Sequence, residues 1–96
     1  MLDLNRNQIK KIEGLEMLTS LEELYLGDNQ IEKVEGLEAQ SQSLKVLWID
    51  SNKIGDESTL SYLGNTLKKL ENLVIYKNPV CPGFNTTSEF AKKAKE

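Results

Sequence analysis

Leu24-Tyr25-Leu26-Gly27-Asp28-Asn29-Gln30-Ile31 is the stretch that decides the fold of this 96-residue chain. Its pattern, apolar-x-apolar-x-x-Asn-x-apolar, occurs four times, and the other three copies span residues 2–9, 47–54 and 73–80. The asparagines of the four copies are 22, 23 and 26 residues apart. Because recurrence at such a period is typical of stacked structural units, the chain is predicted to be a repeat protein.

Each copy is predicted to begin as a short strand and to end in a turn. Alternate side chains of a strand face opposite sides, so Leu24 and Leu26 are expected to face a core and Tyr25 to face away from it. Strands this short bury their apolar side only when neighbours stack in parallel. The asparagine side chains are expected to bond backbone groups in the turns, which makes four residues structural: Asn7, Asn29, Asn52 and Asn78.

The third copy is followed by a different return segment. Glu57 stands at the position that Ile12 holds in the first unit. The leucines that follow are spaced by three and four residues, which predicts one face of a short helix: Leu60, Leu63 and Leu67. We expect Asp56 or Ser58 to cap its start and Gly64 to be a point of interruption.

The four copies resemble the leucine-rich-repeat pattern. Asn-Gln-Ile-x-x-Ile-Glu-Gly-Leu at residues 7–15, nearly repeated at 29–37, resembles the 22-residue class typified by the nuclear regulatory subunit of protein phosphatase 1. Residues 70–80 and 85–90 are similar to the closing repeat and cap of axonemal dynein light chain 1. The resemblance implies an α/β leucine-rich-repeat solenoid: a short curved parallel sheet, a convex side of loops, 3-10 turns or a short helix, and a carboxyl-terminal helical cap.

The predicted repeats span residues 1–80, with the first repeat incomplete, and the predicted cap helix spans 81–96. Thr86 and Glu89 form a capping-box pattern that predicts a helix over 87–95, with Phe90 as its anchor and Cys81 packed beneath the cap. The chain starts inside a repeat and stops before the strand that usually closes the cap, so we expect a fragment or an abbreviated gene product. Its first strand, 2–4, is expected to fray, to self-associate through the open edge, or to be covered.

The composition argues against several classes of function. Lys and Arg total 12 against 15 Asp and Glu, a net charge of −3, which argues against direct binding of a nucleic-acid backbone. Histidine is absent and Cys81 is the only cysteine, so neither a usual general base nor a cysteine-based zinc site is available. No apolar run is long enough for a membrane span. We therefore predict no enzyme, no metal, no cofactor and no membrane partner.

The positions that face away from the core form the candidate binding face. Its central column holds Asp3, Tyr25, Trp48 and Val74, and tryptophan and tyrosine are enriched at binding hot spots. The predicted partner-binding residues are Tyr25, Trp48, Val74, Tyr76, Glu23, Asp28, Asp50 and Lys77. The alternative is that the rings only cover neighbouring strands and stabilise the sheet.

Acidic residues outnumber basic ones on this face, which suits a basic protein segment or helix. The set consists of Asp3, Glu22, Glu23, Asp28, Asp50 and Glu71 against Arg6, Lys45 and Lys77. The resemblance implies a non-enzymatic module whose candidate partners are a phosphatase catalytic subunit or a dynein heavy chain. A scaffold of the spliceosomal leucine-rich type and a repeat fragment with no partner of its own are the alternatives. A cytoplasmic or nuclear location is expected, with cilia or flagella as the alternative.

Overall fold

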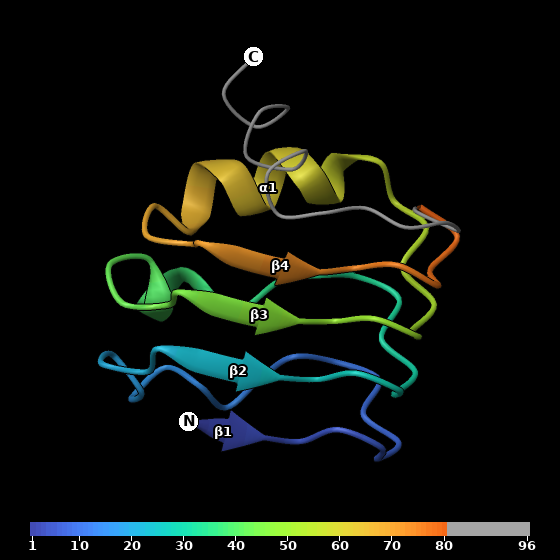
Figure 1. Cartoon of the computed structure of the whole chain (residues 1–96), viewed down its shortest axis with the longest axis horizontal. Coiled ribbons are helices and arrows are strands. Elements are labelled where there is room, and N and C mark those ends of the chain that lie inside the picture. Colours follow the sequence, from blue (N-terminus) through green and yellow to red (C-terminus); the bar gives the residue numbers. More distant parts are fainter. Residues whose placement is uncertain (81–96) are drawn as a thin grey trace.

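Four short strands form one parallel sheet, in which they pair in the order of the chain (Figure 1). The computed structural model describes residues 1–80. The strands are β1 (Leu2–Asp3), β2 (Glu23–Tyr25), β3 (Val46–Trp48) and β4 (Asn72–Val74). The predicted α/β solenoid with a short parallel sheet is therefore confirmed.

The sequence repeat fixes the register of the sheet. Leu2, Leu24, Leu47 and Leu73 are direct partners across the strands, and so are Asp3, Tyr25, Trp48 and Val74. Backbone pairing continues beyond the strands: the N–H of Asp28 donates to the carbonyl oxygen of Asp50 at 2.9 Å. Each unit therefore presents equivalent positions to the next, and the side chains form columns across the sheet.

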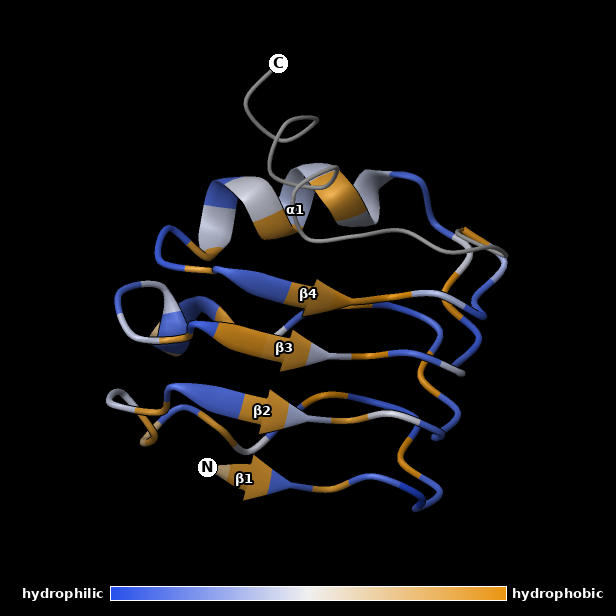
Figure 2. Cartoon of the chain, viewed as in Figure 1, coloured by the Kyte–Doolittle hydropathy of each residue, from blue (hydrophilic) through white to orange (hydrophobic). Residues whose placement is uncertain are grey.

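The core lies between the sheet and the return segments. Leu24, Leu26 and Leu47 are buried, as the alternation of the pattern predicts. Ile31 and Ile54, the apolar residues that follow two of the asparagines, are also buried. In Figure 2 the hydrophobic positions of successive strands and turns lie beside one another, so that one core runs through all the units.

The return segments differ from unit to unit. The first contains no helix, the second contains the 3-10 helix η1 (Glu38–Gln40), and the third contains α1 (Ser58–Thr66). The predicted helix in the third unit is therefore confirmed, and Glu57 before it is exposed. The predicted interruption at Gly64 is wrong, because α1 continues through it. Burial of Leu63 against the core offsets the roughly 1 kcal/mol by which glycine weakens a helix.

Asp56 stabilises the start of α1. Its Oδ1 atom accepts hydrogen bonds from the backbone N–H of Ser58 at 2.9 Å and from the Ser58 hydroxyl at 2.7 Å. These two bonds lower the pKa of the Asp56 carboxyl, with the hydroxyl as the larger cause. The residue at the cap position is Glu57, which makes no side-chain cap bond, so the prediction that Asp56 or Ser58 occupies this position is wrong. Asp56 instead bonds Ser58 from one residue before the cap.

The predicted cap lies outside the described residues, and this includes Cys81, Phe90 and the Thr86–Glu89 pair. Within residues 1–80, no helix has the length and apolar character needed to cross a membrane.

Candidate functional site

Asparagine side chains hold the strands of the candidate face in place. The Oδ1 atom of Asn29 accepts hydrogen bonds from the N–H groups of Asn7 and Ile9, both at 3.1 Å. Its Nδ2 atom donates to the carbonyl oxygens of Leu4 and Leu26, both at 3.0 Å. One side chain therefore joins the turn of its own unit to the turn of the unit before it.

The other asparagines of the pattern occupy equivalent places. Asn78 Oδ1 accepts from the N–H groups of Asn52 and Ile54, both at 3.1 Å. Asn7 Nδ2 donates to the carbonyl oxygen of Leu4 at 2.9 Å, within its own turn. The ladder of asparagines therefore runs across all four described units.

The residue before each asparagine adopts a left-handed backbone conformation. The four φ values are 57° at Arg6, 57° at Asp28, 54° at Ser51 and 60° at Lys77. Residues other than glycine rarely adopt this conformation, which is a local cost that the asparagine bonds offset. The reversal turns each asparagine inward and places the preceding side chain at the exit of its strand.

An aromatic pair lies at the centre of the candidate binding face, which is the concave face of a solenoid of this kind. The rings of Tyr25 and Trp48 meet edge to face, with centroids 5.0 Å apart and an interplanar angle of 83°. The Tyr25 hydroxyl donates to Glu23 Oε1 at 2.9 Å, and this bond is the main cause of the raised pKa of Tyr25. Tyr25 and Glu23 are half-buried, whereas Trp48 is 39% exposed. The structure therefore brings three predicted site residues into one contact group.

The remaining predicted residues lie on either side of this group. Val74 on β4 pairs in register with Trp48 and is half-buried. Tyr76 and Lys77 form a separate pair, in which Lys77 Nζ lies 5.8 Å from the centroid of the Tyr76 ring. Lys77 is exposed and Tyr76 is half-buried. The two tyrosines of the predicted set therefore belong to different local contacts.

A hollow of about 380 Å³ opens beside Trp48, where the chain leaves β1, β2 and β3. Asp28, which is exposed, and Asp50, which is half-buried, contribute the acidic part of its lining. Arg6 also lines it, so its charge is mixed. The full lining is Asn5, Arg6, Gly27, Asp28, Trp48, Asp50 and Ser51.

Four of the lining residues are missing from the predicted partner-binding set, and they are Asn5, Arg6, Gly27 and Ser51. Asn5 Oδ1 accepts the N–H of Gly27 at 2.6 Å, and a Cβ atom on Gly27 would lie 2.6 Å from Asp50 Oδ1. Gly27 therefore leaves the room that the side chains of Asn5 and Asp50 occupy. The signal was present in the sequence, because Gly27 stands where the other copies carry Asn5, Asp50 and Tyr76.

The convex side contains two further polar contacts that the repeat pattern does not indicate. The Tyr62 hydroxyl of α1 donates to Glu38 Oε2 of η1 and accepts the N–H of Leu37 at 3.1 Å. Desolvation and the bond to Glu38 raise the pKa of Tyr62 to about 12. Gln40 is buried, and its Nε2 atom donates to the carbonyl oxygen of Leu15 at 2.8 Å.

The chemistry of the concave face is that of binding. Rigid aromatic rings, carboxylates and backbone-held turns provide apolar area and charge on a fixed sheet. In the part of the chain that the structure describes, no group of three or more His, Cys, Asp or Glu could hold a metal ion.

Comparison with known proteins agrees with this architecture. A family model described as "Leucine Rich repeats (2 copies)" matches residues 1–39, and one described as "Leucine Rich repeat" matches residues 40–58. A Bos taurus protein named "Leucine-rich repeat-containing protein 23" is 41% identical over 78 residues, which is 81% of this chain and 22% of that protein. The Homo sapiens protein of the same name is 40% identical over 76 residues, 79% of this chain and 22% of that protein.

The chain therefore spans about a fifth of the length of the curated relatives it matches. Repeat domains of this kind are generally protein–protein interaction modules that use extended concave surfaces. The four in-register strands, the ladder of asparagines and the two family matches agree, and the chain belongs to the leucine-rich-repeat family.

Proposed function

We propose that the chain is a non-enzymatic module that binds a protein partner on its concave face around Trp48. The observation that carries this proposal is the 39% exposure of the Trp48 side chain in β3, an interior strand of the sheet. A partner that covers the exposed indole buries apolar surface, which favours binding. Tryptophan and tyrosine near the centre of an interface supply most of its affinity.

Tyr25 prepares Trp48 for binding. Its ring meets the indole edge to face, with 5.0 Å between the ring centroids, and restrains the Trp48 side chain. Less rotamer freedom is then lost when a partner binds, which favours affinity. The same contact serves the alternative role of stabilising the sheet. The binding role is favoured because the contact still leaves Trp48 the most exposed aromatic residue among residues 1–80.

The charges around Trp48 favour a partner segment with basic side chains. Glu23 bonds to Tyr25, and Asp28 and Asp50 line the hollow beside Trp48. Arg6 lines the same hollow, so acidic side chains outnumber the one basic side chain around the aromatic pair. Such charges mainly set the rate and the register of association. Binding should therefore weaken with added salt chiefly through a slower association rate.

The candidate partners can be ranked by the proteins that the repeats resemble. A phosphatase catalytic subunit comes first, because the 22-residue units resemble those of its nuclear regulatory subunit. A dynein heavy chain comes second, and a partner in a spliceosomal scaffold comes third. The corresponding locations are the cytoplasm or nucleus, with cilia or flagella for the second candidate.

Capture by the candidate partners tests the binding face. Trp48→Ala and Tyr76→Ala are compared with the parent chain in pull-downs of a phosphatase catalytic subunit and of dynein heavy-chain motor fragments, followed by titration calorimetry. Trp48→Ala is expected to lower the affinity about thirtyfold, which corresponds to roughly 2 kcal/mol for a hot-spot residue. Tyr76→Ala should have a smaller effect, because Tyr76 lies outside the Tyr25–Trp48 pair.

Glu32→Ala, an exposed position on the return segment of the second unit, is the matched control and should bind normally. Circular dichroism establishes that each variant folds. Capture that is unchanged by both aromatic substitutions would remove the concave face from the proposal. A mobility-shift assay at low salt separately tests nucleic acid, for which no shift is expected.

A further inference from the structure

The hollow beside Trp48 lies where one side chain is missing from a column of the sheet. Trp48 ends β3, and Asp50 follows it on the same side of the sheet, because Ile49 between them is buried. The equivalent positions in the second unit are Tyr25 and Gly27, and glycine has no side chain to place there. The hollow of about 380 Å³ therefore arises from the sequence of the second unit.

Two side-chain oxygens lie over Gly27. Asp50 Oδ1 is 2.6 Å from the place that a Cβ atom would take on Gly27, and Asn5 Oδ1 is 3.1 Å from the same place. Asn5 Oδ1 accepts the Gly27 N–H at 2.6 Å, and an amide oxygen can accept a second hydrogen bond. Acceptors from the first and third units therefore meet over the glycine of the second unit.

The two carboxylates of the hollow can also accept further hydrogen bonds. Asp50 Oδ2 accepts the Ser51 hydroxyl at 3.5 Å, which is at the limit of a hydrogen bond. Asp28 is exposed where the chain leaves β2. Among residues 1–80 neither carboxylate forms an ion pair, although Arg6 lines the same hollow. Two negative charges and one positive charge leave one negative charge that a ligand can balance.

The indole of Trp48 is the aromatic part of the lining. Its side chain is 39% exposed, and the contact with Tyr25 restrains it. A cation over an aromatic ring is attracted to the ring face, and tryptophan attracts it more strongly than tyrosine or phenylalanine. The hollow therefore combines an aromatic surface, several acceptors and a net negative charge.

Arginine has the side chain that best matches this combination. Its guanidinium is planar, always charged, and carries five N–H donors and no acceptor, so it can supply a donor to each acceptor of the hollow. It can also stack on an indole while its N–H groups bond a carboxylate. Lysine carries its charge at one point and cannot do both as well. An apolar side chain would cover Asp50 without bonding it, which is costly.

We propose that the hollow beside Trp48 is a pocket for one arginine side chain of the protein partner, stacked on the indole and bonded to Asp28 and Asp50. This inference rests on the proposed binding of a partner to the concave face, and it names the partner residue that sets the register of the complex. Arg6 repels the same cation, so it favours a single basic residue over a run of basic residues.

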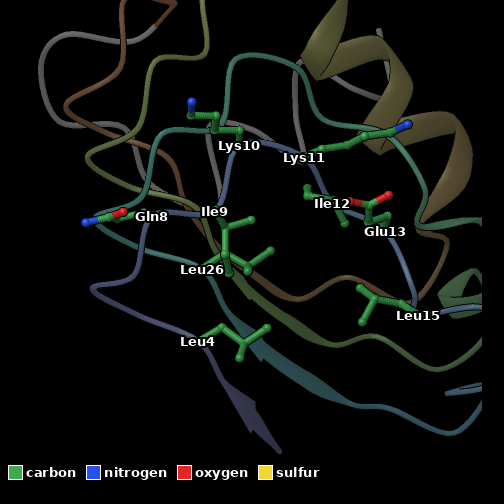
Figure 3. Close-up of a pocket in the computed structure, with 9 residues that line it drawn as sticks. All are labelled: Leu4, Gln8, Ile9, Lys10, Lys11, Ile12, Glu13, Leu15 and Leu26. Atoms are coloured by element: carbon green, nitrogen blue, oxygen red, sulfur yellow. The ribbon is translucent and has the colours of Figure 1, made fainter.

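A second hollow in the chain has different chemistry and serves as a comparison. It measures about 440 Å³, and its lining includes Lys10 and Lys11 against one acidic residue, Glu13. Figure 3 shows its apolar side chains gathered around the first turn and return segment, and they are Leu4, Ile9, Ile12, Leu15 and Leu26. Because its lining is apolar with an excess of positive charge, arginine should not bind there.

Short peptides test the pocket without the partner. A tripeptide of glycine, arginine and glycine with blocked ends is titrated into the isotope-labelled chain, and the N–H signals are followed by NMR. We expect shifts at the Trp48 indole and the Gly27 and Asp28 amides, and none at Ile9 and Ile12. Citrulline, which has nearly the shape of arginine but no charge, should bind at least about tenfold more weakly. Tripeptides with lysine and leucine should also bind more weakly than the arginine tripeptide.

Charge variants test the residues of the pocket one at a time. Asp28→Asn and Asp50→Asn should each weaken binding of the arginine tripeptide at least about threefold. Arg6→Gln should strengthen it about twofold, because a like charge is removed. Glu32→Gln, at an exposed position of the second return segment, removes the same charge as the aspartate variants and should leave the affinity unchanged. The NMR spectrum of each variant establishes that it folds.

Several results would overturn the pocket. They are equal binding of arginine and citrulline, tighter binding of leucine, shifts at Ile9 and Ile12 in place of Trp48, and an equal loss of affinity in Glu32→Gln and Asp50→Asn. Partner capture that depends on Trp48, together with no preference for arginine, would overturn the pocket alone. Capture that does not depend on Trp48, together with a clear preference for arginine, would overturn the proposed partner-binding face and leave an arginine site.

Discussion

Asparagine side chains link neighbouring units, because they bond backbone N–H and carbonyl groups that the turns would otherwise leave without a partner. Asn29, Asn52 and Asn78 are 7%, 8% and 2% exposed, yet each is hydrogen-bonded on both sides of its amide. Buried amides are costly unless all their partners are present. The same residue at the same place in each unit therefore couples the turns into one structure.

Replacing Asn52 with alanine should strongly destabilise the chain. The substitution removes the acceptor for the Ile31 N–H at 3.0 Å and the donor to the Leu26 carbonyl oxygen at 3.0 Å, both buried. Each buried group left unsatisfied costs about 1–3 kcal/mol, so we expect the free energy of unfolding to fall by about 3 kcal/mol or more. Urea denaturation measures this. Asn72→Ala, at an exposed position on β4, is the control and should change stability by less than about 0.5 kcal/mol.

Substitutions at two glycines can measure the cost of a left-handed backbone separately from the cost of a steric clash. Gly14 and Gly36 have φ values of +79° and +75°, but only at Gly36 would a Cβ atom meet backbone, 2.7 Å from the carbonyl oxygen of Ile12. At Gly14 nothing lies within 4 Å of the added atom. Gly14→Ala should cost about 1 kcal/mol for the left-handed conformation alone. Gly36→Ala should cost at least about 1 kcal/mol more in thermal or urea unfolding, and equal losses would contradict this.

At the scale of elements, the repeat made the strands and the returns predictable. Alternating leucines placed β2 and β3 and their buried sides, and the loss of an apolar residue at Glu57 indicated α1. The sequence also aligned Tyr25 with Trp48, because residues one period apart occupy one column. These features follow from local periodicity, which one sequence contains in full.

Other contacts could not be predicted, because they depend on distances between segments of different shape. Tyr62 and Glu38 are 24 residues apart, in a helix and a 3-10 turn that have no counterpart in the first unit. Gln40 reaches the carbonyl oxygen of Leu15 from 25 residues away. At Gly27 the sequence carries a signal, a glycine where the other copies have larger residues, but the pattern of apolar residues does not indicate that the side chains of Asn5 and Asp50 occupy the room that it leaves.

Alkaline pH should weaken the contact between α1 and η1. Tyr62 has its pKa raised from 10.0 to about 12, so its neutral form is favoured in the folded chain. Above pH 10 the unfolded chain binds fewer protons than the folded one, and stability falls as pH rises from 10 towards 12. Stability measured by urea denaturation across this range should decline. Tyr62→Phe should reduce the decline while lowering stability at pH 7, because the bonds to Glu38 and Leu37 are lost. The raised pKa of Tyr25 leaves a residual decline in that variant.

At the scale of the whole molecule, each unit depends mainly on its neighbours. The sheet order follows the chain order, so β2 and β3 have a strand on each side, whereas β1 borders the open end. In such a stack, stability is a sum of unit and interface contributions. An interior unit therefore contributes to two interfaces, whereas the first unit contributes to one.

This difference predicts unequal effects of the same substitution along the leucine column. Leu47 is 0% exposed between Leu24 and Leu73, so Leu47→Ala should lower the free energy of unfolding by about 2–5 kcal/mol. Leu2 occupies the equivalent place on β1 but is half-buried, so Leu2→Ala should cost less than half as much. Trp48, the only tryptophan, reports on β3 by fluorescence, while hydrogen exchange reports on each strand.

For Leu47→Ala, fluorescence and far-ultraviolet circular dichroism should give one coincident transition at a lower urea concentration, because one core runs through all the described units and Leu47 contributes to the interfaces on both of its sides. For Leu2→Ala, faster exchange should be confined to the first unit, with little change at Trp48. Equal destabilisation by the two substitutions would contradict a stack of neighbour-dependent units. It would mean that Leu2 contributes as much to the core as Leu47 does, although Leu2 is half-buried and Leu47 is fully buried.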